Sequence, residues 1–130
     1  MPHIHTLRVY YEDTDMAGIV YYANYLKFIE RGRSEWVRGI GVDQNALRDE
    51  TGIVFAVRRI EADYLAPARL DDVLTVETGL TGISGARFVM DQRVLRGAQV
   101  LFAARVVVVA MSLDGRPQRL PEAVRTLMAA

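Results

Sequence analysis

Hydrophobic positions recur at three- and four-residue steps in the segment after residue 21, and charged residues occupy most positions between them. This pattern predicts an amphipathic helix of about 18 residues, long enough to lie along a five-stranded sheet. Gly39 and Gly41 end the segment in the usual way. A second, short helix is predicted over Asp43–Glu50, with Asp43 as its N-cap and Gly52 as its stop. The apolar stripe of the long helix consists of Tyr22, Leu26, Ile29, Gly32 or Arg33, Trp36 and Ile40.

The rest of the chain follows the two-residue period of strands. Thr6–Tyr11 alternates, and so does Ile53–Tyr64 apart from a slip at Arg58-Arg59 that indicates a β-bulge. The unbroken valines of Val106–Val109 suit an interior strand. A strand, a long helix, a short helix and four strands in a meander predict an α+β fold with a five-stranded antiparallel sheet, in one domain over residues 1–130. The last three predicted strands are Val73–Leu80, Arg87–Arg96 and Val100–Met111, and a final short helix opens at Pro121-Glu122.

Composition narrows the class of protein. The 130 residues are 51% hydrophobic and 25% charged, which suits a globular domain. Lys+Arg and Asp+Glu each total 16, so no net basic field would attract nucleic acid. Cys is absent, which excludes a disulfide scaffold, a thiolate zinc site and a cysteine nucleophile. The N-terminal residues lack the pattern of a secretion signal, and the apolar runs are too short for a transmembrane helix, so we expect a cytoplasmic protein.

The loop Glu12–Val20 places carboxylates directly before the long helix. A helix N-terminus presents unpaired N–H groups and a partial positive charge, which can bind a developing oxyanion. Gly18 would let the backbone turn closely enough for a substrate to approach. A carboxylate facing such a site is the minimum equipment for acyl-group hydrolysis. From the residues alone, the commoner role of Asp13 and Asp15 is to stabilise the turn before the helix, and a Mg²⁺ or Ca²⁺ site there lacks further oxygen ligands.

Two motifs carry a resemblance to a known family. Asp13–Tyr25, followed by Phe28–Arg33, is similar to the signature of the 4-hydroxybenzoyl-CoA thioesterase family of hotdog proteins, and within it to the bacterial Tol–Pal-associated acyl-CoA thioesterases. The likeness runs nearly end to end and includes Arg8–Asp15 and Tyr64–Asp72. It implies a hotdog fold, in which a five-stranded antiparallel sheet wraps around one long central helix. It also implies hydrolysis of an acyl-CoA thioester to a free acid and CoA.

The resemblance implies residue roles as well. Asp15 matches the family's catalytic carboxylate, which acts as nucleophile or general base on the thioester carbonyl. Tyr22 matches the position at the helix start whose backbone N–H polarises that carbonyl, and Gly18 is the turn residue between them. The Tol–Pal-associated branch commonly has His at the position of Tyr22, whereas the 4-hydroxybenzoyl-CoA branch has an aromatic residue there. A backbone N–H role survives this difference, but an imidazole acid–base role does not.

Aromatic and acidic side chains near the motif are further candidates for substrate contact. Tyr21, Tyr25 and Trp36 could line an acyl pocket, although aromatics on an amphipathic helix usually belong to the core. Glu30 is a rival carboxylate, because the catalytic acid of another hotdog lineage lies on the long helix. With the Asp15 motif intact, we expect Glu30 to be a solvated or salt-bridged helix residue.

The phosphates of CoA would need basic groups at the mouth of the pocket. By their location on the later strands, the candidates are Arg58, Arg59, Arg87 and Arg93. The basic cluster of the 4-hydroxybenzoyl-CoA branch is not reproduced, since Ile83–Arg87 contains a single arginine. His3 and His5 are expected to be a solvated pair in an N-terminal tail. No cofactor and no metal site are expected.

Because hotdog subunits place their site between two chains, the resemblance implies a homodimer or a homotetramer. An acyl carrier protein in place of CoA, and a link to the Tol–Pal system, are the other partners that it suggests. Two alternatives stay open at this point. A hotdog enoyl-thioester hydratase normally needs an Asp/His pair, which the predicted core lacks. The second is a non-catalytic or weakly active scaffold of the cell-envelope machinery. The feature that favours it is Tyr22, which stands where the Tol–Pal-associated branch commonly has His.

Overall fold

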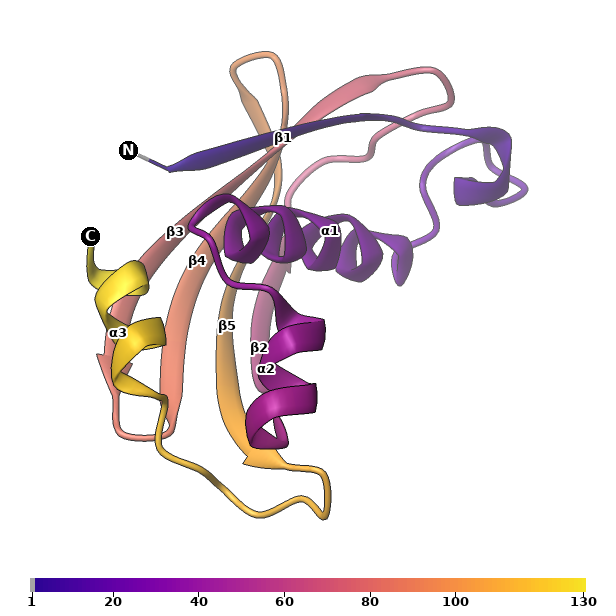
Figure 1. Ribbon diagram of the computed structural model, residues 1–130. Coiled ribbons are helices and arrows are strands. Elements are labelled where there is room, and N and C mark those ends of the chain that lie inside the picture. The colour runs from indigo at the N-terminus through magenta and orange to yellow at the C-terminus, as the bar shows by residue number, and fades with distance from the viewer. Residues whose placement is uncertain (1) are drawn as a thin grey trace.

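Five strands form one antiparallel sheet, and helix α1 (Asn24–Gly39) lies across one of its faces (Figure 1). The computed structural model describes residues 2–130. The sheet and the single long helix confirm the predicted α+β class. The other elements are β1 (His3–Arg8), a 3₁₀ turn (Tyr11–Asp13), α2 (Gln44–Thr51), β2 (Ile53–Tyr64), β3 (Val73–Ser84), β4 (Arg87–Arg96), β5 (Gln99–Ser112) and α3 (Glu122–Ala129).

The strand order is β1-β3-β4-β5-β2, so the predicted four-strand meander is wrong. Only β3, β4 and β5 follow one another as hairpins; β2 pairs with β5 at one edge, and β1 pairs with β3 at the other. Periodicity reports which face of a strand is buried, but it does not report which strand lies beside it. The valine-rich β5 is an interior strand as predicted, and β2 is left as a twelve-residue edge strand.

The first strand lies earlier in the chain than predicted. It spans His3–Arg8 instead of Thr6–Tyr11, so His3 and His5 are paired with β3 and do not form a solvated tail. The chain leaves the sheet at Val9, which is fully buried and exchanges backbone hydrogen bonds with the turn at residues 71–72. Tyr10 and Tyr11 are both exposed, and they form the cap and the first residue of the 3₁₀ turn. Their alternating pattern does not make a strand, because no neighbouring strand pairs with this part of the chain.

Several local predictions are confirmed to the residue. Asp43 caps α2 by accepting a hydrogen bond from the Ala46 amide at 3.1 Å, and Gly52 ends the helix in the left-handed region. β2 has the predicted bounds, with a register shift between Val57 and Arg59 where the bulge was expected. β3 continues past its predicted end to Ser84 before the chain turns.

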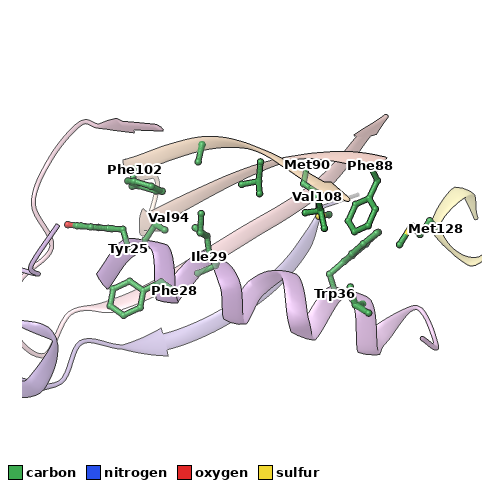
Figure 2. Close-up of a cluster of buried hydrophobic side chains, with 14 of the residues drawn as sticks. Tyr25, Phe28, Ile29, Trp36, Phe88, Met90, Val94, Phe102, Val108 and Met128 are labelled. Carbon is green, nitrogen blue, oxygen red and sulfur yellow. The ribbon is translucent and has the colours of Figure 1, made fainter. Parts of the chain in front are cut away.

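The face of α1 that packs on the sheet is rotated from the predicted stripe. Ile29 and Trp36 are buried as expected, but Leu26 is exposed because Tyr25 and Phe28 occupy the buried face beside Ile29. Tyr22 is also exposed, and it lies before the regular helix, which begins at Asn24. The buried cluster between α1 and the sheet includes stacked Tyr25 and Phe102 rings at one end and Trp36 against Phe88 at the other (Figure 2).

Gly32 sets how closely α1 approaches the sheet. A Cβ atom on Gly32 would lie 2.6 Å from Cγ1 of Val76. At this contact the fully buried Gln92 side chain donates to the Ile29 carbonyl at 2.8 Å and to Thr78 Oγ1 at 2.9 Å. The helix and the sheet are therefore joined by a satisfied buried polar group. No helix within residues 2–130 combines the length and apolar character that crossing a membrane requires.

Candidate active site

The loop between β1 and α1 contains a tight hairpin that carries Asp15. The Asp15 amide donates to the Ile19 carbonyl at 2.9 Å, and the Gly18 amide donates to the Asp15 carbonyl at 3.0 Å. Gly18 has a φ of +78°, a conformation that glycine adopts without strain. Asp15 is exposed, and its Oδ1 accepts a hydrogen bond from the Ala17 amide at 2.9 Å. Its Oδ2 has no hydrogen-bond partner among the described residues.

Asp13 is held differently from Asp15. Its Oδ2 accepts a hydrogen bond from the Tyr10 amide at 2.8 Å, and its carbonyl accepts from the Tyr21 amide and from Asn24 Nδ2. Asp13 therefore fastens the hairpin to the start of α1, whereas Asp15 keeps one carboxylate oxygen without a hydrogen bond. In the part of the chain that the structure describes, no three His, Cys, Asp or Glu side chains gather as a metal site.

The two residues directly before α1 offer unpaired amides. The N–H groups of Tyr22 and Ala23 have no acceptor within residues 2–130, whereas their neighbours Tyr21 and Asn24 donate to backbone carbonyls. Free amides at a helix N-terminus can donate to a carbonyl oxygen that acquires negative charge. The hairpin that holds Asp15 is tied to this turn through Asp13.

A cavity of about 380 Å³ lies beside the helix start. Its walls are mostly apolar and aromatic, and three tyrosines contribute to it, one each from the loop before α1, from α1 and from β2. The rings of Tyr22 and Tyr64 meet edge to face at 6.2 Å. Asp15 stands on the hairpin next to this cavity and does not form its wall. The lining residues are Ile19, Val20, Tyr22, Tyr25, Tyr64, Leu65, Ala66 and Pro67.

The predicted aromatic contacts separate into three environments. Tyr25 lines the cavity but is 3% exposed, and its hydroxyl accepts a hydrogen bond from the Ala68 amide at 3.0 Å. Burial is the main reason that the pKa of Tyr25 is raised. Tyr21 is exposed outside the cavity, with its pKa raised by its hydrogen bond to Tyr22. Trp36 is a core residue against Phe88, far along α1.

The four candidate arginines fall into two pairs with different surroundings. Arg58 and Arg87 line a second cavity, of about 340 Å³, whose floor includes Val109 and Met111. Neither of these arginines has an ion-pair partner within the described chain. The other two are paired on the sheet surface, Arg59 with Glu61 at 3.3 Å and Arg93 with Glu77 at 2.6 Å.

The two cavities lie toward opposite ends of β5. Phe102 is paired with Tyr64 at one end, and Met111 is paired with Val54 near the other. Arg58 lies six residues before Tyr64 on β2, and Arg87 is opposite Val109, seven residues from Phe102 on β5, so each arginine is roughly 20 Å from the Tyr64 end of the sheet. A single chain therefore does not bring Arg58 and Arg87 to the hairpin of Asp15.

Glu30 is exposed on α1, and its Oε1 accepts a hydrogen bond from the Ser34 hydroxyl at 2.8 Å. It borders a third cavity, of about 200 Å³, together with Arg33 and Phe55. Burial lowers the pKa of Arg33 and the charge of Glu30 partly offsets this. Glu30 is thus a helix residue beside a basic neighbour, and it is separate from the Asp15 hairpin.

An ion pair holds the segment of residues 66–72 that borders the first cavity. Asp72 accepts a hydrogen bond from the Arg69 amide at 2.8 Å and pairs with Arg96 at 2.7 Å. Partial burial acts to raise the pKa of Asp72, but the Arg69 amide and the Arg96 guanidinium outweigh it, and the pKa lies below its ordinary value.

Replacing Asp72 with asparagine should lower the free energy of unfolding near pH 7 by about 1 kcal/mol, because a partly exposed charged hydrogen bond is lost. Since the pKa of Asp72 is lower in the folded state, its contribution is present above about pH 4 and is lost as the pH falls through the folded pKa. Urea unfolding at neutral and acidic pH measures this effect. A difference between wild type and variant that does not shrink in acid would contradict the ion-pair account.

A family model of the thioesterase-like superfamily matches residues 9–127. The chain belongs to this superfamily. The acyl-CoA thioesterase YbgC of Haemophilus influenzae is 40% identical over 120 residues, which cover 92% of this chain and 88% of that protein. The crystal structure of a probable thioesterase from Bartonella henselae has a TM-score of 0.88 at 40% identity and covers 93% of this chain and 100% of that chain.

A second solved structure of the thioesterase-like superfamily contains a substrate. It is an aspartate-to-asparagine variant of 4-hydroxybenzoyl-CoA thioesterase in complex with 4-hydroxybenzoyl-CoA. Its TM-score is 0.90 at 26% identity, and the match covers 98% of both chains. These comparisons confirm the family and the hotdog fold that the motifs of the sequence indicated.

Tyr64 is a residue of the first cavity that the sequence pattern did not indicate as a site residue. Its ring lines the first cavity, and its hydroxyl donates to the Tyr22 carbonyl at 3.0 Å. The available signal was its place at the head of the second family motif, Tyr64–Asp72, directly after a strand.

Proposed function

We propose that this protein hydrolyses acyl-CoA thioesters to the free acid and CoA, with Asp15 as nucleophile or general base and the Tyr22 amide as oxyanion donor. The observation that carries the proposal is that one loop holds both a carboxylate with a free oxygen, Asp15, and the free amides of Tyr22 and Ala23. The hydrogen bonds of Asp13 tie the two parts of this loop together. The class of substrate is supported by the relatives named acyl-CoA thioesterase and by the related structure that holds an aromatic acyl-CoA.

Hydrolysis of a thioester needs few catalytic groups, because a thioester carbonyl has weak resonance stabilisation. Attack at this carbon places negative charge on the carbonyl oxygen, where the amides of Tyr22 and Ala23 would stabilise it. The carbon–sulfur bond then breaks, and the thiolate of CoA leaves and takes up a proton. Asp15 either forms an acyl anhydride that water hydrolyses, or removes a proton from the attacking water. Both routes consume one water molecule for each thioester.

The working unit that we propose is a homodimer, alone or within a tetramer. Asp15 is exposed in a single chain, and the unpaired arginines lie away from it, Arg58 in the middle of β2 and Arg87 at the start of β4. The edge strand β2 can pair antiparallel with its copy across a two-fold axis. Such pairing would bring the end of the sheet that holds the second cavity in one subunit toward the Tyr64 end of β2 in the other. Arg58 and Arg87 would then meet the phosphates of CoA bound at the partner's hairpin.

A panel of butanoyl-CoA, palmitoyl-CoA and benzoyl-CoA with a thiol reagent tests the function. We expect thiol release from at least one of them, and sedimentation of the same preparation should give a dimer or larger. Crotonyl-CoA distinguishes a hydratase, which would add water without releasing thiol. A folded oligomer that releases no thiol from any ester would instead favour a scaffold. Acyl carrier protein as a carrier, a link to the Tol–Pal system and a cytoplasmic location stay predictions.

A further inference from the structure

The carbonyl of Tyr22 takes its hydrogen bond from a residue 42 positions away. Oη of Tyr64 donates to this oxygen at 3.0 Å. No backbone N–H within residues 2–130 donates to it, although a carbonyl at a helix start commonly accepts from the amide four residues ahead. The amide of Leu26 donates to the carbonyl of Ala23. The Tyr64 hydroxyl is therefore the partner that satisfies this part of the first turn.

The position of the Tyr64 hydroxyl is determined by the sheet. Tyr64 is the last residue of β2 and is paired with Phe102 of β5. Its ring meets the rings of Phe102 at 5.0 Å and Tyr25 at 5.6 Å, both edge to face. A tyrosine hydroxyl is ordinarily protonated in neutral solution, and burial raises the pKa of Tyr64 further, so this hydroxyl can donate. The end of β2 thus holds the Tyr64 hydroxyl, a hydrogen-bond donor, against the Tyr22 carbonyl before α1.

We propose that Tyr64 is a positioning residue for thioester hydrolysis, whose hydroxyl holds the Tyr22–Ala23 peptide so that the free amides of this turn face the thioester carbonyl. The inference rests on the proposed function. The Tyr22 carbonyl and the Ala23 N–H belong to one planar peptide unit, so a bond to the oxygen fixes the direction of the N–H. The same bond polarises this N–H and strengthens it as a donor. It also restrains rotation about Tyr22, which sets the direction of the Tyr22 amide.

The Tyr64→Phe variant tests this role because it keeps the ring and removes only the hydroxyl. Loss of one orienting hydrogen bond should lower kcat by about 3- to 15-fold and change KM by less than about twofold. The matched control is Tyr11→Phe, since Tyr11 is 83% exposed and lies outside the cavity. This control should retain wild-type kcat. A Tyr64→Phe variant with wild-type kcat, or with an effect confined to KM, would overturn the proposal.

A spectroscopic measurement separates positioning from a general structural role. Benzoyl-CoA is bound to the Asp15→Asn variant, and the stretching frequency of its thioester carbonyl is measured by isotope-edited infrared spectroscopy. Adding Tyr64→Phe should return this band toward its frequency in water, because the carbonyl is less polarised. An unshifted band would overturn the role of Tyr64 alone. Wild-type turnover by Asp15→Asn would instead contradict the proposed function, so the two failures are distinguishable.

Discussion

The Asp15→Asn variant should hydrolyse acyl-CoA with a kcat lower by about a hundred- to ten-thousandfold. The substitution removes the charge of the one hairpin carboxylate whose Oδ2 is free, and with it the nucleophile or the base. The fold should be unaffected, because the asparagine oxygen can still accept the hydrogen bond from the Ala17 amide. Single-turnover and steady-state assays with the best ester of the panel measure the effect.

The matched control for this loss is Asp49→Asn, which makes the same change on exposed α2 at an ion pair with Arg48. It should leave kcat within about twofold of wild type, as an exposed pair contributes little. Mass spectrometry of the Asp15→Asn protein excludes deamidation back to aspartate. Undiminished turnover by the intact variant would show that hydrolysis does not depend on Asp15.

The Gly32→Val variant should lose at least about 3 kcal/mol of folding free energy, because three added carbons enter the close contact between α1 and the sheet. The first of them would already lie 2.6 Å from Val76 Cγ1 and 3.0 Å from Thr78 Oγ1. Val76 is fully buried, and side chains in a close-packed interior have little room to move. Chemical unfolding monitored by circular dichroism measures the loss.

The same substitution at Gly39 serves as the control for helix propensity. A Cβ atom on Gly39 meets no atom within 4 Å, although this glycine also lies in α1. Gly39→Val should therefore change stability by less than about 0.5 kcal/mol. Equal destabilisation at both positions would mean that the packing at Gly32 is not what limits the approach of the helix.

Prediction from the sequence succeeded where neighbours in the chain decide the outcome. The cap at Asp43 and the stop at Gly52 depend on groups a few residues away, and both are confirmed. The bulge beside Arg59 was indicated by a slip in alternation within one strand. The hairpin with Gly18 has the positive φ that its glycine indicated. The carboxylate motif also indicated the correct family.

The same reasoning failed for contacts between distant segments. The alternation of residues predicted a first strand that continues to Tyr11. The observed strand ends at Arg8, because β3 pairs with it no further. Tyr22 was assigned to the buried stripe, yet it is 62% exposed because the helix starts two residues later. Four arginines were equivalent candidates until the fold paired Arg59 and Arg93 with acids.

The amino-acid pattern by itself thus determined most of the elements, the cap and stop of α2 and the turn at Gly18 before α1, since these follow from interactions over a few residues. Only the tertiary structure decided that β2 joins β5, that Gly32 faces Val76, and that Tyr64 bonds to Tyr22. Those choices depend on which arrangement of the whole sheet buries the most apolar surface and satisfies its polar groups. That balance involves partners tens of residues apart, and no local period records it.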